Sequence, residues 1–156
     1  MTHNIYNSPI GQLLIEIENE TVIGIRPLAE EISRSEPSRL HNMVSKELDE
    51  FFAGNRRQFN FPITMHGTEF QMSVWSELQK IPFGHTATYG EIAKRIGKPG
   101  ASRAVGMACN RNPLLIVVPC HRVVGCNGAL TGFAAGIEKK RFLLMMEKKI
   151  IPPTCG

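Results

Sequence analysis

The sequence contains no run of about 18 or more apolar residues, the length that a membrane-spanning helix requires. Residues 1–4 show neither the charged nor the apolar part of a leader segment, so we expect a protein that crosses no membrane. The four cysteines lack the spacing of a secreted disulfide framework. We therefore expect reduced thiols and a cytoplasmic location.

Charge is divided unevenly along the chain. Residues 1–65 carry 6 Lys and Arg against 9 Asp and Glu, whereas residues 66–156 carry 12 against 5. A basic surface that neutralises phosphates gains affinity for nucleic acid without reading its sequence. The C-terminal part is therefore a candidate for nucleic-acid binding, although a basic surface that faces only water gives the same count.

Residues 1–64 are predicted to form a small α+β domain with a structural role. The spacing of apolar residues over 39–53 predicts a helix, which Gly54 ends. The segment carries no metal-ligand cluster and no paired acid and base. Apolar alternation predicts short strands around Ile5–Asn7, Leu13–Ile17, Val22–Ile25 and Phe59–Ile63, the first three antiparallel and joined at Pro9–Gly11 and Asn19–Glu20.

Residues 65–156 are predicted to form a second, mainly helical domain. Thr88 is a candidate N-cap for a helix that runs to residue 96, and Glu91 would complete a capping box. A glycine-containing turn over 97–100 leads to a second helix over 101–111. Two short helices around such a turn are typical of a helix-turn-helix.

The helix predicted over 101–111 has two different faces. At about 100° per residue one face is polar and basic and the other is small and apolar. An amphipathic helix packed on a core with solvated arginines is the alternative to a nucleic-acid-binding helix. The first face holds Arg103, Met107, Asn110 and Arg111, and the second holds Ala101, Val105, Ala108 and Cys109.

A cysteine and a histidine are adjacent at the end of an apolar, β-branched segment, as Cys120 and His121. A thiol reacts as its thiolate, so a neighbouring proton acceptor can activate it at neutral pH. The pair could instead be a core cysteine beside a loop histidine, or part of a Cys-His hydrolase. A zinc site built from Cys109, Cys120, His121 and Cys126 is a further alternative, but its spacing is irregular.

The residues around this pair resemble one family closely, the O6-alkylguanine-DNA alkyltransferases, whose signature is Pro-Cys-His-Arg-Val. The resemblance covers about residues 65 to 147 and is looser before them, chiefly at Ser8–Gly11. The matching motifs are Gly67–Gln71, Val74-Trp75, Ile81-Pro82, Thr88–Ala93, Arg103–Gly106, Asn112-Pro113, Pro119–Val123, Gly128, Leu130–Phe133, Gly136, Lys139, Leu143-Leu144 and Glu147.

The resemblance implies a fold, a reaction and a partner. It implies an α+β protein, with a ribonuclease H-like domain over 1–64 and a winged-helix-like helix-turn-helix within 65–156. Such a protein repairs DNA by moving a methyl or larger alkyl group irreversibly from O6-alkylguanine, with O4-alkylthymine as a second candidate substrate, to its own cysteine. It implies no cofactor and no metal, and the zinc ligands of some relatives have no match here. The implied partner is double-stranded DNA, bound by a monomer through the minor groove.

The resemblance also implies roles for single residues. Cys120 would be the nucleophile, His121 its base through a water molecule, and Glu147 the carboxylate that orients His121. Tyr89 would crowd the rotated phosphate and give a proton to the departing guanine. Asn112 would connect the active-site loop to the helix-turn-helix.

Access to a paired base requires the nucleotide to be turned out of the stack. By resemblance, Arg103 would fill the vacated space from a helix lying in the minor groove. The small residues of that helix would allow a close approach. The implied DNA-contacting residues are Tyr89, Ser102, Arg103, Ala104, Gly106 and Asn110.

The implied base pocket departs from the family pattern at two positions. Phe133 stands where tyrosine is usual, and Ala135 where glycine is usual, which affects the expected substrate range and not the reaction. Non-catalytic lesion-binding relatives are the main alternative, but they commonly replace the nucleophile with tryptophan, and Cys120 is present. The implied pocket residues are Cys109, Leu115, Val123, Phe133 and Ala134.

Overall fold

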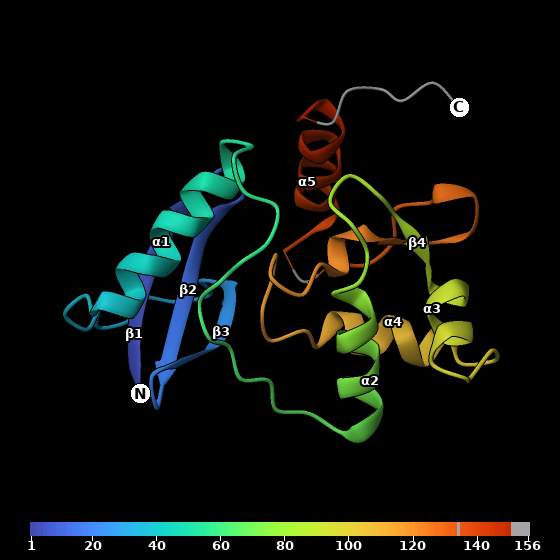
Figure 1. Ribbon diagram of the computed structural model, residues 1–156, viewed down its shortest axis with the longest axis horizontal. Coiled ribbons are helices and arrows are strands. Elements are labelled where there is room, and N and C mark those ends of the chain that lie inside the picture. The colour runs from blue at the N-terminus through green and yellow to red at the C-terminus, as the bar shows by residue number, and fades with distance from the viewer. Residues whose placement is uncertain (134, 151–156) are drawn as a thin grey trace. The chain divides into compact units, whose positions relative to one another are not determined.

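The computed structural model describes residues 1–133 and 135–150 and shows an α+β protein (Figure 1). Its contacts divide the chain into two compact units. The first unit comprises residues 1–66 together with Pro113–Leu115, and the second comprises 67–112 and the described residues that follow Leu115. No helix in the described part of the chain has both the length and the hydropathy of a bilayer span.

The first unit is built on a three-stranded antiparallel sheet in the order β1-β2-β3. Asn19 and Glu20 form the β2–β3 turn with φ values of 51° and 63°, the left-handed backbone that lets a two-residue turn follow the twist of its strands. The predicted antiparallel strands are therefore confirmed. They span Thr2–Ser8 (β1), Gly11–Glu18 (β2) and Thr21–Pro27 (β3).

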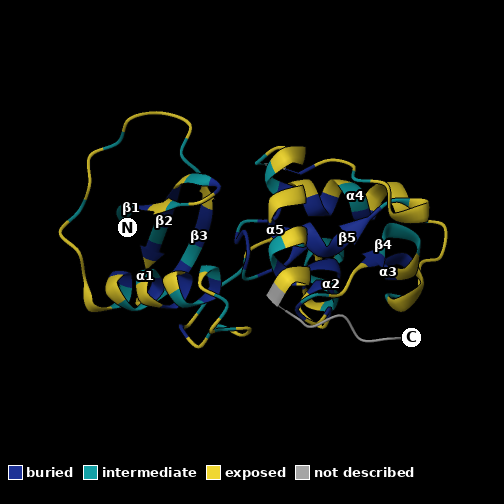
Figure 2. Cartoon of the chain, turned by 90° about the horizontal axis from the view of Figure 1, so that it is seen from above, coloured by how far each residue is buried: buried dark blue, intermediate teal, exposed yellow. Residues whose placement is uncertain are grey.

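The helix α1, Arg39–Phe52, packs its apolar side on this sheet and exposes its other side (Figure 2). Ser38 caps the helix. Its hydroxyl oxygen accepts a hydrogen bond from the backbone N–H of His41, and Nδ1 of the His41 ring accepts one from the backbone N–H of Ser38. Tyr6 Oη donates to Asp49 Oδ1 at 2.6 Å and links β1 to the helix. The helix predicted over 39–53 is confirmed.

The strand predicted around Phe59–Ile63 is wrong, because only a single parallel bridge forms there, between Ile63 and Val22. Pro62 has no amide to donate and contributes only its carbonyl, to Val22 N at 2.9 Å. The same free edge of β3 also pairs with Leu114, through hydrogen bonds of 2.9 Å from Ile25 N to Pro113 O and from Leu115 N to Ile25 O. Pro113–Leu115 is therefore part of the first unit, which local periodicity did not predict.

The second unit is mainly helical. A short parallel pair, β4 with β5, lies among its helices and is largely buried (Figure 2). Two 3₁₀ turns, Cys120–Arg122 and Cys126–Gly128, flank β5. Its other elements are α2 (Glu69–Leu78), β4 (Ala87–Thr88), α3 (Tyr89–Arg95), α4 (Ser102–Asn110), β5 (Val123–Val124) and α5 (Ile137–Ile150).

The helices α3 and α4 agree with the two predicted over 88–96 and 101–111. Thr88 caps α3, accepting the amide of Glu91 at 3.1 Å. The predicted capping box is incomplete, because the Glu91 carboxylate makes no hydrogen bond with the backbone N–H of Thr88. It lies instead 3.6 Å from Arg95 Nη2, one turn along the helix. An exposed carboxylate can choose either partner at similar free energy.

Trp75 joins α2 to α4. Its indole N–H donates to Ala108 O at 2.9 Å, and its side chain is 2 % exposed. Gly67, just before α2, lies so close to this ring that an added Cβ would come within 2.5 Å of Trp75 Cζ3. The buried side of α4 carries Val105, Ala108 and Cys109. The two predicted faces of this helix are confirmed, since Arg103, Met107, Asn110 and Arg111 are exposed.

Candidate active site

The thiol of Cys120 is buried and hydrogen-bonded to one side chain. It lies in the first 3₁₀ turn, is 3 % exposed, and accepts a hydrogen bond from Asn112 Nδ2 at 3.2 Å. The same amide nitrogen donates to Val118 O at 2.7 Å, which holds the apolar segment before the cysteine. Asn112 thus connects the end of α4 to the reactive loop.

Burial raises the pKa of the Cys120 thiol to about 11, although the Asn112 hydrogen bond and the charge of Lys140 act in the opposite direction. The resting thiol is therefore protonated at neutral pH. The structure does not support direct activation by the adjacent histidine, because the contacts of His121 go elsewhere. Asn112 and Lys140 are the side chains that favour the thiolate.

His121 and Glu147 form a buried pair, although 26 residues separate them. Nε2 of His121 lies 2.7 Å from Oε2 of Glu147, and neither side chain is exposed. Burial lowers the pKa of His121 more than the Glu147 contact raises it, so the ring is neutral at pH 7. A carboxylate only accepts, so Nε2 carries the proton and Nδ1 keeps a lone pair. Nδ1 has no hydrogen-bond partner within the described residues.

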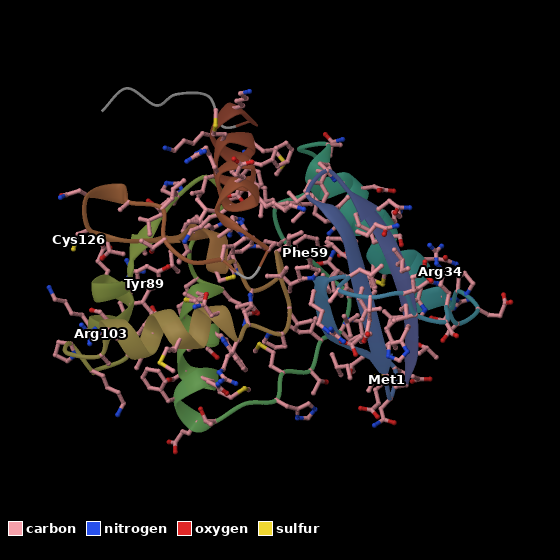
Figure 3. The ribbon with its side chains drawn as sticks, turned by 180° about the vertical axis from the view of Figure 1, so that it is seen from behind. Met1, Arg34, Phe59, Tyr89, Arg103 and Cys126 are labelled. Atoms are coloured by element: carbon pink, nitrogen blue, oxygen red, sulfur yellow. The ribbon has the colours of Figure 1, made fainter. Side chains whose placement is uncertain are left out.

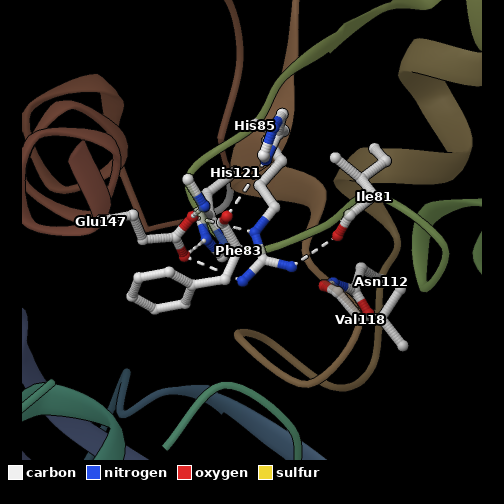
Figure 4. Close-up of polar contacts among 9 residues, drawn as sticks. Ile81, Phe83, His85, Asn112, Val118, His121 and Glu147 are labelled. Atoms are coloured by element: carbon white, nitrogen blue, oxygen red, sulfur yellow. Dashed lines mark hydrogen bonds and ion pairs between the residues drawn. The ribbon is translucent and has the colours of Figure 1, made fainter. Parts of the chain in front are cut away.

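Arg122, the next residue in the chain, completes the network around His121 and Glu147, which are labelled in Figure 4. Its Nε and Nη2 donate to the two oxygens of Glu147 at 2.9 and 3.0 Å, and Nη1 donates to Ile81 O at 2.8 Å. The amide of Gly84 adds a bond of 3.0 Å to Glu147 Oε1. Burial opposes ionisation of Glu147, but its bonds with His121 and Arg122 outweigh it and lower the pKa to about 2. The sequence showed Arg122 in the motif but indicated no role for it.

A second polar group surrounds Tyr89. Its phenol donates to Thr131 O at 3.3 Å and accepts from Thr131 Oγ1 at 3.2 Å and from Lys140 Nζ at 3.4 Å. Lys140 also donates to Thr131 O at 2.7 Å and lies over the Tyr89 ring, 5.7 Å from its centre. Burial raises the pKa of the phenol, which keeps its proton in place at neutral pH.

Lys140 lies in this site and is a residue that sequence reasoning missed, since the motif match included its neighbour Lys139. Its side chain is fully buried, and burial lowers its pKa while the sulfurs of Cys120 and Cys109 oppose that effect. A signal was present in the sequence. Lys140 precedes the buried Leu143 and Glu147 at a spacing of three and then four, which puts all three on one face of α5.

The exposed face of α4 borders a surface cavity of about 370 Å³. Five of the six residues predicted to contact DNA line it, together with Thr131 and Gly132, whereas Ala104 is exposed outside it. Figure 3 shows the side chains of Tyr89 and Arg103 close together at this face. The five predicted residues in the lining are Tyr89, Ser102, Arg103, Gly106 and Asn110.

The residues predicted to line a base pocket are only partly brought together. Cys109, Val123 and Phe133 are buried in the second unit, whereas Leu115 pairs with β3 in the first. Burial raises the pKa of the Cys109 thiol to about 12, with a smaller contribution from the neighbouring Cys120, so this second thiol is also protonated at neutral pH. Ala134 lies outside the described residues.

The alternative zinc site finds no support in the geometry. Cys126 is exposed on the second 3₁₀ turn, whereas Cys109, Cys120 and His121 are buried. Throughout residues 1–133 and 135–150, no group of three or more His, Cys, Asp or Glu side chains could hold a metal ion.

Comparison with known proteins gives a consistent assignment. Residues 69–149 match the family model described as 6-O-methylguanine DNA methyltransferase, DNA binding domain. A methylated-DNA–protein-cysteine methyltransferase of Methanosarcina acetivorans is 46 % identical over 153 residues, which cover 94 % of this chain and 98 % of that protein. The protein of the same name from Mycobacterium tuberculosis is 43 % identical over 154 residues, covering 94 % and 92 %.

Solved structures agree with the sequence relatives. The crystal structure of Mycobacterium tuberculosis OGT in complex with DNA superposes with a TM-score of 0.90 at 39 % identity, covering 97 % of this chain and 96 % of that one. An O6-methylguanine DNA methyltransferase from Methanococcus jannaschii gives a TM-score of 0.73 at 28 % identity, covering 97 % of each. The Pro119–Val123 motif is buried, and the relatives match nearly the whole chain. The protein belongs to the methylated-DNA–protein-cysteine methyltransferase family.

Proposed function

We propose that this protein repairs DNA by transferring an alkyl group from O6-alkylguanine to the sulfur of Cys120. The observation that carries the proposal is the buried Cys120 thiol, hydrogen-bonded by Asn112 and followed in the chain by the His121–Glu147 pair. The family relatives are named for this reaction and match nearly the whole chain. A purely lesion-binding role is not favoured, because the nucleophile is present.

The reaction is an in-line displacement at the alkyl carbon. The Cys120 thiol gives its proton, through a water molecule, to the free lone pair of His121 Nδ1. Glu147 stabilises the imidazolium that forms, and Arg122 keeps Glu147 ionised. The thioether product offers no good leaving group, so each molecule acts once.

The departing guanine leaves more easily as a neutral base than as an anion. Tyr89 holds the proton for it, because a phenol is protonated at neutral pH and burial raises the pKa of this one further. Lys140 lies 3.4 Å from the phenol oxygen and stabilises the negative charge that remains there. We therefore add Lys140 to the residues that carry the reaction.

DNA is the proposed partner of the exposed face of α4. The related protein from Mycobacterium tuberculosis was crystallised in complex with DNA, and the cavity beside α4 gathers the residues expected to contact it. On this proposal a monomer binds alkylated duplex DNA through the minor groove, and Arg103 fills the space of the flipped nucleotide. The helices α3 and α4 with the β4–β5 pair support a winged-helix-like arrangement.

Two finer points belong to the same proposal. The sheet of β1–β3 covered by α1 is consistent with a ribonuclease H-like N-terminal domain with a structural role. The domain boundary is proposed near residues 64 and 65. A reducing, cytoplasmic setting suits a thiol that must stay unoxidised until used.

Mass spectrometry of the intact protein tests the function. Incubation with a duplex that contains one O6-methylguanine should add one methyl mass per protein, on the peptide that holds Cys120. Cys120→Ala should gain no mass and still bind the duplex, whereas Cys126→Ala, a control at an exposed thiol, should react normally. An unmodified protein that keeps its original mass with Cys120 reduced would contradict the proposal, and so would methylation of Cys120→Ala at another residue.

A further inference from the structure

One residue, Thr131, contacts the phenol of Tyr89 in two ways. Its carbonyl oxygen accepts the phenol proton at 3.3 Å, and its hydroxyl donates back to the phenol oxygen at 3.2 Å. Both residues line the cavity beside α4, where the flipped base would enter. The two residues are 42 positions apart in the chain, which explains why the contact has no local sequence signal.

Lys140 is the third member of this group and touches both partners. Its ammonium donates to the Thr131 carbonyl at 2.7 Å and to the Tyr89 phenol oxygen at 3.4 Å. When the phenol proton leaves, the Thr131 carbonyl still has Lys140 as a donor. The phenol oxygen then accepts from the Thr131 hydroxyl and from Lys140. The arrangement therefore satisfies these groups before and after proton transfer.

We propose that Thr131 is a positioning residue for proton donation by Tyr89, and that its hydroxyl stabilises the phenolate left when the guanine departs. This inference rests on the proposed function and deepens it. As the Cys120 sulfur bonds to the alkyl carbon, the bond from that carbon to O6 breaks and its electron pair passes to guanine. The phenol proton moves to guanine, and the phenolate regains a proton through solvent, to which His121 releases the proton that it took from the thiol.

The hydroxyl matters because Tyr89 is a weak acid in this environment. Burial raises the pKa of the phenol, and the hydrogen bond from Thr131 acts in the opposite direction. A hydrogen bond to an ionised acceptor is stronger than one to a neutral acceptor. The Thr131 hydroxyl therefore stabilises the product of proton transfer more than the resting phenol, which lowers the barrier.

Two substitutions separate the hydroxyl from the rest of the side chain. Thr131→Val replaces the hydroxyl with a methyl group of similar size, and Thr131→Ser keeps the hydroxyl. We expect Thr131→Val to slow transfer from O6-methylguanine duplex and from free O6-benzylguanine by about tenfold at saturation, and Thr131→Ser to recover most of that rate. Thr86→Val makes the same chemical change at an exposed threonine of the second unit and serves as the control.

A reagent whose leaving group needs no proton tests the mechanism. Iodoacetamide alkylates a thiol and releases iodide, so Thr131→Val should react with it at the unmodified rate when the reaction is followed on the peptide that holds Cys120, apart from the exposed Cys126. In a Tyr89→Phe background, which lacks the phenol, adding Thr131→Val should cause no further loss of transfer from O6-benzylguanine. If Thr131 only shaped the cavity, Thr131→Val would slow transfer even in the Tyr89→Phe background.

Three results would overturn the inference. The first is that Thr131→Val slows the reactions with iodoacetamide and with O6-benzylguanine equally. The second is that Thr131→Ser transfers the alkyl group as slowly as Thr131→Val. The third is that the losses of transfer rate from Tyr89→Phe and Thr131→Val add up in the double variant. Failure of the proposed function is a different result. In that case the unmodified protein itself would take no alkyl group from either guanine substrate, while still reacting with iodoacetamide.

Discussion

His121 Nε2 lies 2.7 Å from Glu147 Oε2 in a site where neither side chain is exposed to solvent. The contact fixes the tautomer of the ring and turns Nδ1 away from the carboxylate. Because Arg122 holds both oxygens of the same carboxylate, Glu147 serves the reaction and the packing of α5 together. A change at Glu147 should therefore affect activity and stability at once.

Glu147→Gln removes the negative charge but keeps an oxygen that His121 can donate to. We expect alkyl transfer to slow by at least about tenfold, because the imidazolium loses its stabilising charge. We also expect a loss of about 3–5 kcal/mol in the free energy of unfolding, because Arg122 remains buried without its partner. Single-turnover rates and urea unfolding measure the two effects.

The pH dependence of stability gives a further test of Glu147. Its folded pKa of about 2 lies below the ordinary value of 4.5, so its contribution is complete above pH 4.5 and is lost as pH falls towards 2. Glu147→Gln should flatten the unfolding free energy in that window. Glu138→Gln, at an exposed position of α5, is the control. An equally steep acid loss in Glu147→Gln would contradict the assigned pKa.

Asn112→Leu should raise the pKa of Cys120 above about 11, because the amide hydrogen bond to the sulfur favours the thiolate. The rate of reaction with iodoacetamide, followed against pH, should show its midpoint at higher pH. Stability should fall by about 1–3 kcal/mol, since Val118 O loses a donor. Asn42→Leu, at an exposed position of α1, should change neither quantity. An unchanged midpoint would show that Asn112 does not tune the thiol.

Arg103→Ala should slow repair in duplex DNA by about tenfold or more. Turning a nucleotide out of the base stack costs a few kcal/mol, and the arginine that fills the empty space offsets part of that cost. Reaction with free O6-benzylguanine needs no base flipping and should stay within about twofold of the unmodified rate. Arg34→Ala removes one positive charge from an exposed site in the first unit and controls for net charge. Equal losses on both substrates would refute the proposed role of Arg103.

Gly67→Ala should destabilise the second unit by about 1–3 kcal/mol, because the new Cβ would meet the Trp75 ring at 2.5 Å. The ring has little freedom to move, since its N–H is bonded to Ala108 O. At Gly100 an added Cβ meets nothing within 4 Å, so Gly100→Ala should have little effect. Thermal unfolding of the two variants measures the difference, and equal midpoints would contradict the close contact.

Sequence reasoning succeeded where the signal was local. Alternation predicted β1–β3, apolar spacing predicted α1, and Thr88 marked the start of α3, because each depends on residues within a few positions. It failed at Phe59–Ile63, where Pro62 removes a donor from the ladder. It had no local signal for the contacts that Lys140 makes with Tyr89 and Thr131, which join separate segments of the chain.

The sequence by itself determined the family and predicted the nucleophile and the helix proposed to face DNA, since each is written in contiguous motifs or in a helical period. Only the tertiary structure decided how that nucleophile is held. Arg122 meets Glu147 across 25 residues, and Tyr89 meets Lys140 across 51. Burial then sets the protonation of Cys120, His121 and Tyr89. Burial is a property of the packed chain, so no run of neighbouring residues encodes it.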